Sequence, residues 1–363
     1  MIKRVFLSFT LLFAIICCMG CEEIVSRAKD SSDVIELNDI SKVEDYAEDA
    51  LKDGQKEITF KTEDIEEDDL SEINNDINSY YGEVEKYIVS TDVLGVKEFT
   101  LELSPSVNSY VELYFLKNNE IPKKQKQARL LQEKCQNIMD EILADKDTDY
   151  EKELAIHNYL VENCKYGYVE GAESQNSTAY SSYGALVDGK AVCDGYSQAM
   201  KLLCDLEGIS CDIVIGSAKG ENHAWNCVKL DGEWYQVDTT WDDPKPDNPD
   251  MLQYTYFNMT SEQTRLEHSW EEENYPEASG TKYNYYVKND LVCEDHNDFV
   301  AKCQSIIDES APELVQLQVK DYDEATYDDE LFQEILHNTD VNELMYTNSG
   351  EAPYTTIYLT FSY

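Results

Sequence analysis

The chain has 363 residues, a formal net charge of −45 and a hydrophobic fraction of 42%. That fraction is enough to build a sizeable core, which excludes global disorder, and the length leaves room for two or three domains. The negative charge excludes a nucleic-acid partner, because the phosphates would be repelled.

The first twenty residues have the pattern of a secretory signal. A positive start, MIKR, precedes an apolar run, VFLSFTLLFAII, which is too short to span a membrane. Gly20 before Cys21 resembles the lipobox of bacterial lipoproteins, although Cys18 stands where that pattern usually has Leu. The resemblance implies a signal peptide over 1–20, a lipid on Cys21, and anchoring at the extracytoplasmic face of the cell membrane. Plain secretion is the alternative.

A short acidic tether over 21–40 leads into a small α/β domain, predicted over 41–118. Ser41 has the position of an N-cap for a helix that ends at Gly54. Beyond it, EITF, KEFTLEL and YVELYFL have the composition of strands, and an acidic helical piece lies near 68–79.

The central domain is predicted over 119–280, and it begins with a long amphipathic helix over 121–146 and a second helix over 149–163. A second small α/β domain is predicted over 281–363. Its segment VQLQVKDYDEATYDDELFQEI echoes EITFKTEDIEEDDLSEINNDI near the N-terminus, since both pass from a strand through acidic residues into a helix. This echo suggests that the flanking domains are a repeat.

Cys193 lies at the start of a predicted central helix, whose apolar positions recur at helical spacing from Tyr196 to Cys204. At a helix start, free backbone N–H groups and the positive end of the helix dipole stabilise a thiolate. Eight cysteines follow Cys21, at spacings too wide for a C-x-x-C zinc site, and their pairing stays open. No metal and no cofactor is predicted.

A β-hairpin follows, because Asp231-Gly232 lies between alternating apolar residues. A two-residue turn there places Leu230 opposite Glu233. Continued along both strands, this register puts four side chains on one face: His223, Trp225, Asp238 and Thr240. Two of them, the imidazole of His223 and the carboxylate of Asp238, become diagonal neighbours at about 7–8 Å between backbones, a gap that the side chains can close.

A thiol at a helix start and a histidine oriented by an acid are the groups that acyl transfer needs. His223 would take the thiol proton and later protonate the leaving amine, while Asp238 would support the charged ring. Cys193 would attack an amide carbonyl and form a thioester, and its own backbone N–H can form part of the oxyanion hole.

Three motifs together, YGALVDGKAVCDGYSQAMKLLCDLEGI, HAWNCVKLDGEWYQVDTTWDDP and YFNMTSEQTRLEHSW, resemble the bacterial branch of the transglutaminase-like superfamily. The resemblance covers about residues 120–275. It implies an α+β fold in which a papain-like core packs the cysteine-bearing helix on an antiparallel sheet, with the flanking domains outside it. It also implies catalytic roles for Cys193, His223 and Asp238, and packing roles for Trp225, Thr240 and Trp241.

The leading hypothesis is therefore a membrane-anchored thiol enzyme that acts on amides of a protein or peptide substrate, with an amine or water as acyl acceptor. Some members of such a superfamily lose catalysis, because a fold does not fix a function. The alternative hypothesis is a non-catalytic surface module that binds peptides or cell-wall material. The oligomeric state stays open.

Overall fold

The structure is a computed structural model, which describes residues 34–76, 78–91, 95–171, 177–243, 251–320, 322–337, 339 and 341–363. The predicted signal peptide, Cys21 and most of the tether lie outside these residues. The chain divides into two compact units, one ending at Ser106 and one beginning at Val107. Within the described ranges, no helix is both long and apolar enough to cross a membrane.

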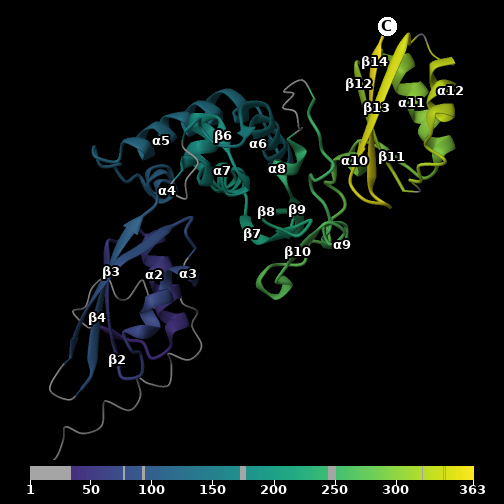
Figure 1. The fold of residues 1–363 in the computed structure, drawn as a ribbon. Coiled ribbons are helices and arrows are strands. Elements are labelled where there is room, and N and C mark those ends of the chain that lie inside the picture. Colours follow the sequence, from purple (N-terminus) through teal and green to yellow (C-terminus); the bar gives the residue numbers. More distant parts are fainter. Residues whose placement is uncertain are drawn as a thin grey trace, which may run out of the picture. The chain divides into compact units, whose positions relative to one another are not determined.

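The first unit is a four-stranded sheet with its helices on one face (Figure 1). Its elements are β1 (Ile35–Glu36), α2 (Ile40–Lys52), β2 (Glu57–Thr62), α3 (Ile73–Asp76), β3 (Gly82–Thr91) and β4 (Lys97–Pro105), and the strand order is β1-β2-β4-β3. Burial alternates along β4, as expected for a sheet with one covered face. Its buried residues pack in one cluster that includes Phe60, Phe99 and Leu101.

Two predictions about this region are wrong. Asp39, not Ser41, caps α2: its carboxylate accepts a hydrogen bond from the Ser41 N–H at 3.0 Å, so the helix begins at Ile40. The segment YVELYFL is not a strand but part of α4 (Val107–Lys117), in the second unit. There α4 packs against other helices, and this packing overrides the strand propensity of its residues.

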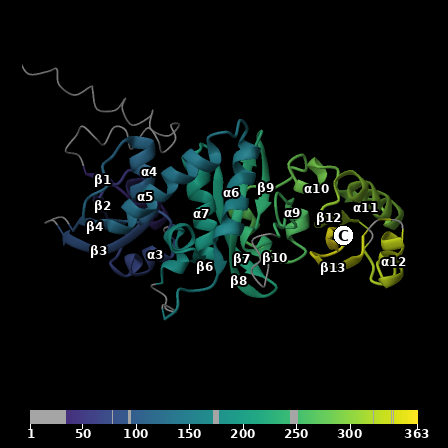
Figure 2. The same cartoon turned by 90° about the horizontal axis from the view of Figure 1, so that it is seen from above.

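The central region places helices next to an antiparallel sheet. Its helices are α5 (Lys126–Ile138), α6 (Asp149–Asn163) and α7 (Cys193–Leu206), and α6 lies beside α7 in both Figure 1 and Figure 2. The strands β7 (Cys211–Ala218), β8 (Glu221–Leu230), β9 (Glu233–Val237) and β10 (His268–Trp270) form a sheet in the order β10-β7-β8-β9. The predicted long first helix begins later than expected, at Lys126, and a π-helical turn at Met139–Leu143 continues it.

The C-terminal part of the second unit has the same topology as the first unit. Its elements are β11 (Val292–Cys293), α11 (His296–Ser310), β12 (Leu314–Val319), α12 (Asp329–His337), β13 (Glu343–Ser349) and β14 (Thr355–Ser362). The strand order is β11-β12-β14-β13, and in both sheets the first pair is parallel and the others are antiparallel. The predicted strand-to-helix echo is therefore confirmed: β2 leads to α3 in one segment, and β12 leads to α12 in the other. Sequence analysis did not predict β3 or β13.

Candidate active site

Cys193 is the first residue of α7, as predicted. Val192 before it has extended backbone, with φ −99° and ψ −178°, so the chain turns into the helix at the cysteine. Gly195 in the first turn lies so close to Ala179 that an added Cβ would be 2.4 Å from the carbonyl oxygen of Ala179. The close contact requires glycine there and fixes the start of the helix.

Cys193 is the most accessible of the eight described cysteines, all of which are free thiols. It is 8% exposed, whereas none of the other seven exceeds 2%. Burial raises the pKa of Cys135 and of Cys164 to about 12, which suppresses their thiolate form. The other thiols therefore behave as small apolar core side chains.

The hairpin register is confirmed. Leu230 pairs with Glu233 and Asn226 with Val237, as the two-residue turn requires. On its other side β8 pairs with β7, where His223 lies opposite Gly216. His223 thus lies on an inner strand of the four-stranded sheet, where β7 pairs with it.

Asp238 directly follows β9 and is the N-cap of a one-turn helix, α8 (Thr239–Asp242). Its Oδ1 accepts a hydrogen bond from the Trp241 N–H at 3.1 Å. Because the strand ends at Val237, the prediction that Thr240 shares the hairpin face is wrong. Thr240 lies within α8 and is buried.

His223 and Asp238 form the predicted pair, with 2.7 Å between Nε2 and Oδ2. Burial opposes the charge on His223, but the charge of Asp238 and its hydrogen bond, together with the nearby sulfur of Cys193, raise the pKa of His223 to about 10. Burial likewise acts to raise the pKa of Asp238, yet His223 and a second histidine hold it well below its usual range. Since Nε2 is taken by Asp238, Nδ1 is the nitrogen available to Cys193.

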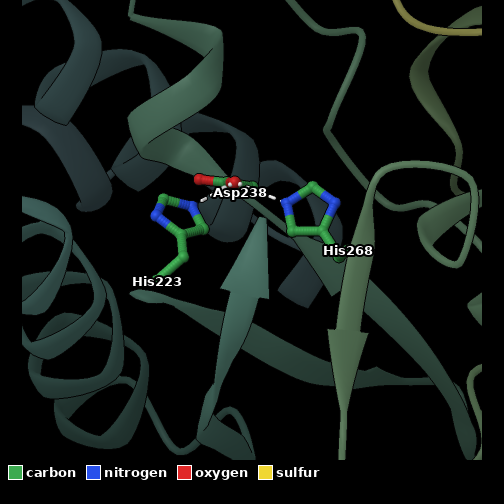
Figure 3. A group of neighbouring side chains, drawn as sticks. All are labelled: His223, Asp238 and His268. Carbon is green, nitrogen blue, oxygen red and sulfur yellow. Dashed lines mark hydrogen bonds and ion pairs between the residues drawn. The ribbon is translucent and has the colours of Figure 1, made fainter. Parts of the chain in front are cut away.

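The second histidine, His268, was missed by sequence analysis. It lies on β10, and its Nε2 is 3.0 Å from Asp238 Oδ2, the same oxygen that His223 bonds. Figure 3 shows the two rings on either side of the carboxylate, each directed at it. The available signal was its place in YFNMTSEQTRLEHSW, the third of the motifs that carry the family resemblance.

Two tryptophans predicted to have packing roles surround His223. The Trp225 ring stacks on it at 6.0 Å between centroids, and the Trp241 ring lies at 5.6 Å. Trp225 is fixed in turn because its Nε1 donates to Gln236 Oε1 at 2.7 Å. The two indoles limit the rotation of the His223 ring.

A second histidine–aspartate pair lies at the other end of α8. His157, on α6, has its Nε2 3.0 Å from Asp242 Oδ2, and neither side chain is exposed to solvent. The other oxygen of Asp242 accepts the Tyr256 N–H at 3.0 Å. Burial raises the pKa of Asp242 to about 6, although the His157 hydrogen bond acts in the opposite direction.

Among the described residues, one group has the composition of a metal site: His223, Asp238 and His268, whose ligand atoms lie within 4.8 Å of one another. The two imidazole nitrogens lie at hydrogen-bond distance from one shared carboxylate oxygen. In a metal site, ligand atoms surround the ion instead of bonding one another. The arrangement fits a carboxylate that accepts two N–H bonds.

Comparison with known proteins identifies the central region. The sequence profile of the Transglutaminase-like superfamily matches residues 136–239. The kyphoscoliosis peptidases of Mus musculus and Homo sapiens are each 30% identical over 116 residues, which is 29% of this chain and 17% of theirs. The chain thus spans about a sixth of the length of these relatives. A crystal structure of a TGase is 18% identical, with 51% of each chain covered and a TM-score of 0.27.

Proposed function

Since the chain contains a domain of the transglutaminase-like superfamily over residues 136–239, we propose that it is a thiol enzyme that transfers or hydrolyses acyl groups of protein or peptide amides. Cys193 is the nucleophile, His223 the acid and base, and Asp238 the group that orients His223. One observation carries the proposal: the His223 ring is hydrogen-bonded to Asp238, and the sulfur of Cys193, at the start of α7, lies near enough to raise the pKa of the ring.

The reaction begins with transfer of the Cys193 proton to His223. The strong stabilisation of the charged ring favours this transfer, which leaves a thiolate at the helix start. The thiolate attacks the amide carbonyl, and the C–N bond breaks as His223 gives its proton to the leaving amine. The thioester is then cleaved by an amine or by water, whose proton passes to His223 and then back to the thiolate as the acyl group leaves.

The acceptor is tested with a glutamine-containing peptide, supplied with and without a primary amine. Ammonia release together with amine incorporation would identify transfer, and ammonia release with water alone would identify hydrolysis. The Cys193→Ala variant is expected to lose at least about 10⁴-fold in rate, because it lacks the nucleophile.

Cys135→Ala is the matched control, since it removes a buried thiol from α5. It should retain the rate and the rapid labelling of Cys193 by iodoacetamide. If wild type and Cys193→Ala react equally with peptides and amines, or if Cys193 resists labelling in the folded protein, the enzyme proposal fails and the non-catalytic module is favoured.

We also propose, from the signal-like sequence, that Cys21 anchors the chain to the outer face of a membrane. The mature N-terminus should then be a lipidated Cys21, measurable by mass spectrometry of the membrane fraction. Cys21→Ala should move the protein into the soluble fraction. An unmodified Cys21 in a soluble wild-type protein would exclude the anchor.

A further inference from the structure

We propose that His268 is a positioning residue that locks the Asp238 carboxylate in the orientation His223 needs. This inference rests on the proposed function, because it assigns His268 to the same site. His268 touches neither Cys193 nor a substrate group directly in the proposed reaction. It acts through Asp238.

The hydrogen bonds of Asp238 hold its carboxylate in one orientation. Oδ2 accepts from His223 at 2.7 Å and lies 3.0 Å from His268 Nε2, while Oδ1 accepts the Trp241 N–H at 3.1 Å. The carboxylate is fully buried. Rotation about its terminal bond would break these contacts with no water to replace them, so each donor restricts it.

Strand pairing and ring contacts hold the His268 side chain in place. β10 pairs with β7 so that His268 lies opposite Ala218. Nearby, β7 approaches β10 so closely that a Cβ on Gly216 would be 2.3 Å from the Ser269 carbonyl oxygen. The ring packs edge-on against Trp225 at 4.9 Å between centroids, and it is tilted against Trp241 at 4.5 Å. His268 is therefore as rigidly held as the carboxylate that it contacts.

The ring nitrogen of His268 that does not contact Asp238, Nδ1, indicates which nitrogen carries the proton. Nδ1 is buried, and the described residues offer it no hydrogen-bond partner. A proton on Nδ1 would be a buried donor without an acceptor, which is costly. The proton therefore sits on Nε2, which donates to Asp238 Oδ2.

The titratable groups facing Asp238 determine how the loss of this donor affects the site. His223 on β8 and His268 on β10 favour its ionised form, whereas burial and the neighbouring Asp242 on α8 oppose it. Without the His268 hydrogen bond, the pKa of Asp238 rises toward its ordinary range. Asp238 then takes up a proton at a higher pH, and the support of charged His223 is lost there.

The test compares two amides at the same position, His268→Gln and His268→Asn. The glutamine amide nitrogen reaches the position of Nε2 and keeps the donor, whereas the asparagine nitrogen reaches only the position of Nδ1. The measurement is the rate of Cys193 alkylation by iodoacetamide from about pH 4 to about pH 9, read by mass spectrometry of the Cys193 peptide.

His268→Gln is expected to stay within about threefold of wild type, and His268→Asn to lose about tenfold or more near neutral pH, with its acid limb moved to higher pH. Equal profiles for the two variants would overturn the proposal. If a metal chelator lowers the alkylation rate of Cys193 in the wild type, His268 is a metal ligand and the positioning role is overturned. If His268→Asn does not fold, labelling of the buried thiols will reveal it.

A measurement on the wild type then decides. Nitrogen-15 NMR of the His268 ring should show a proton on Nε2 and a bare Nδ1, and the opposite tautomer would overturn the proposal. The Cys193→Ala variant separates this inference from the proposed function. If Cys193→Ala is inactive but His268→Asn behaves as wild type, only the role of His268 fails; if Cys193→Ala is fully active, the proposed function fails.

Discussion

Two buried histidine–aspartate pairs lie at the two ends of α8, and they behave in opposite ways. At the first end, Asp238 raises the pKa of His223 to about 10 despite burial, while the pKa of Asp238 falls well below its usual range. At the last residue of the helix, burial raises the pKa of Asp242 to about 6 despite its bond to His157. Beside a histidine, the pKa of the aspartate thus falls in one pair and rises in the other.

The difference lies in the number of donors. Asp238 is bonded by two histidines and a backbone N–H, whereas Asp242 is bonded by one histidine and a backbone N–H. Burial opposes the charge on both, so one further charge-stabilising donor decides which effect prevails. His223 also contacts Cys193, while His157 is wholly enclosed. The first pair is suited to moving protons, and the second to holding α8 in place.

The largest expected effect comes from exchanging the two aspartates for asparagine. Asp238→Asn should lower the acyl-transfer rate by about 10² to 10⁴-fold, because an amide has one acceptor oxygen where the two histidines and the Trp241 N–H use two, and it has no charge to support His223. Asp242→Asn should lower it by less than about tenfold, since the amide oxygen can still accept from one partner. If the two variants lose the same amount of activity in steady-state assays, the two pairs do not differ in their role in the reaction.

The next effect concerns the charge on His223. Its ring should titrate by NMR with a midpoint near 10, and in Asp238→Asn the midpoint should move toward the ordinary value of about 6.5. Since the folded-state pKa is raised, this group stabilises the fold fully below about 6.5 and loses that contribution as the pH rises through about 10. A wild-type midpoint near 6.5 would contradict the ion pair.

The enclosed pair should matter for stability more than for rate. His157→Phe keeps an aromatic ring against Tyr254 and Phe257 but leaves Asp242 without its side-chain donor. We expect a loss of about 3 kcal/mol in the free energy of unfolding, at the lower end for a broken buried pair because Asp242 can take up a proton. Denaturant titration measures it; His337→Phe, on α12, is the control and should change little.

The smallest expected effect comes from Asp242, which makes the free energy of unfolding vary with pH. Its pKa is raised from 3.8 to about 6 in the folded protein, so its contribution is present at low pH and is lost as the pH rises from about 4 to about 6. Asp242→Asn should remove this pH-dependent contribution. The difference in free energy of unfolding between the variant and the wild type should therefore change between about pH 4 and about pH 6. A constant difference would show that Asp242 is not perturbed.

The site could be predicted from sequence where local rules determine it. A two-residue turn sets the register of a hairpin, so the pairing of His223 with Asp238 followed from counting residues. The same count failed two residues later, at Thr240, because Asp238 also caps a helix. Capping and strand pairing compete for such a residue, and spacing alone does not decide between them.

His268 could not be predicted because tertiary structure alone brings it to the site. It stands 30 residues beyond Asp238 in the chain, on a strand of three residues that carries almost no periodic signal. The segment YVELYFL failed for a related reason: contacts with distant helices determine its conformation. Long, periodic helices such as α6, with its capping box at Thr148 and Glu151, were predicted well.

The shared topology of the two flanking sheets has a consequence for folding. Two segments of one chain that build the same strand order can, in principle, exchange strands, and such misassembly is typical of proteins with repeated domains. The inner strands β2, EITFKT, and β12, LVQLQV, are both buried at their second, fourth and sixth residues. Ile58, Phe60 and Thr62 occupy these positions in β2, and Val315, Leu317 and Val319 occupy them in β12, so a strand inserted into the wrong copy would bring side chains of other sizes into the core.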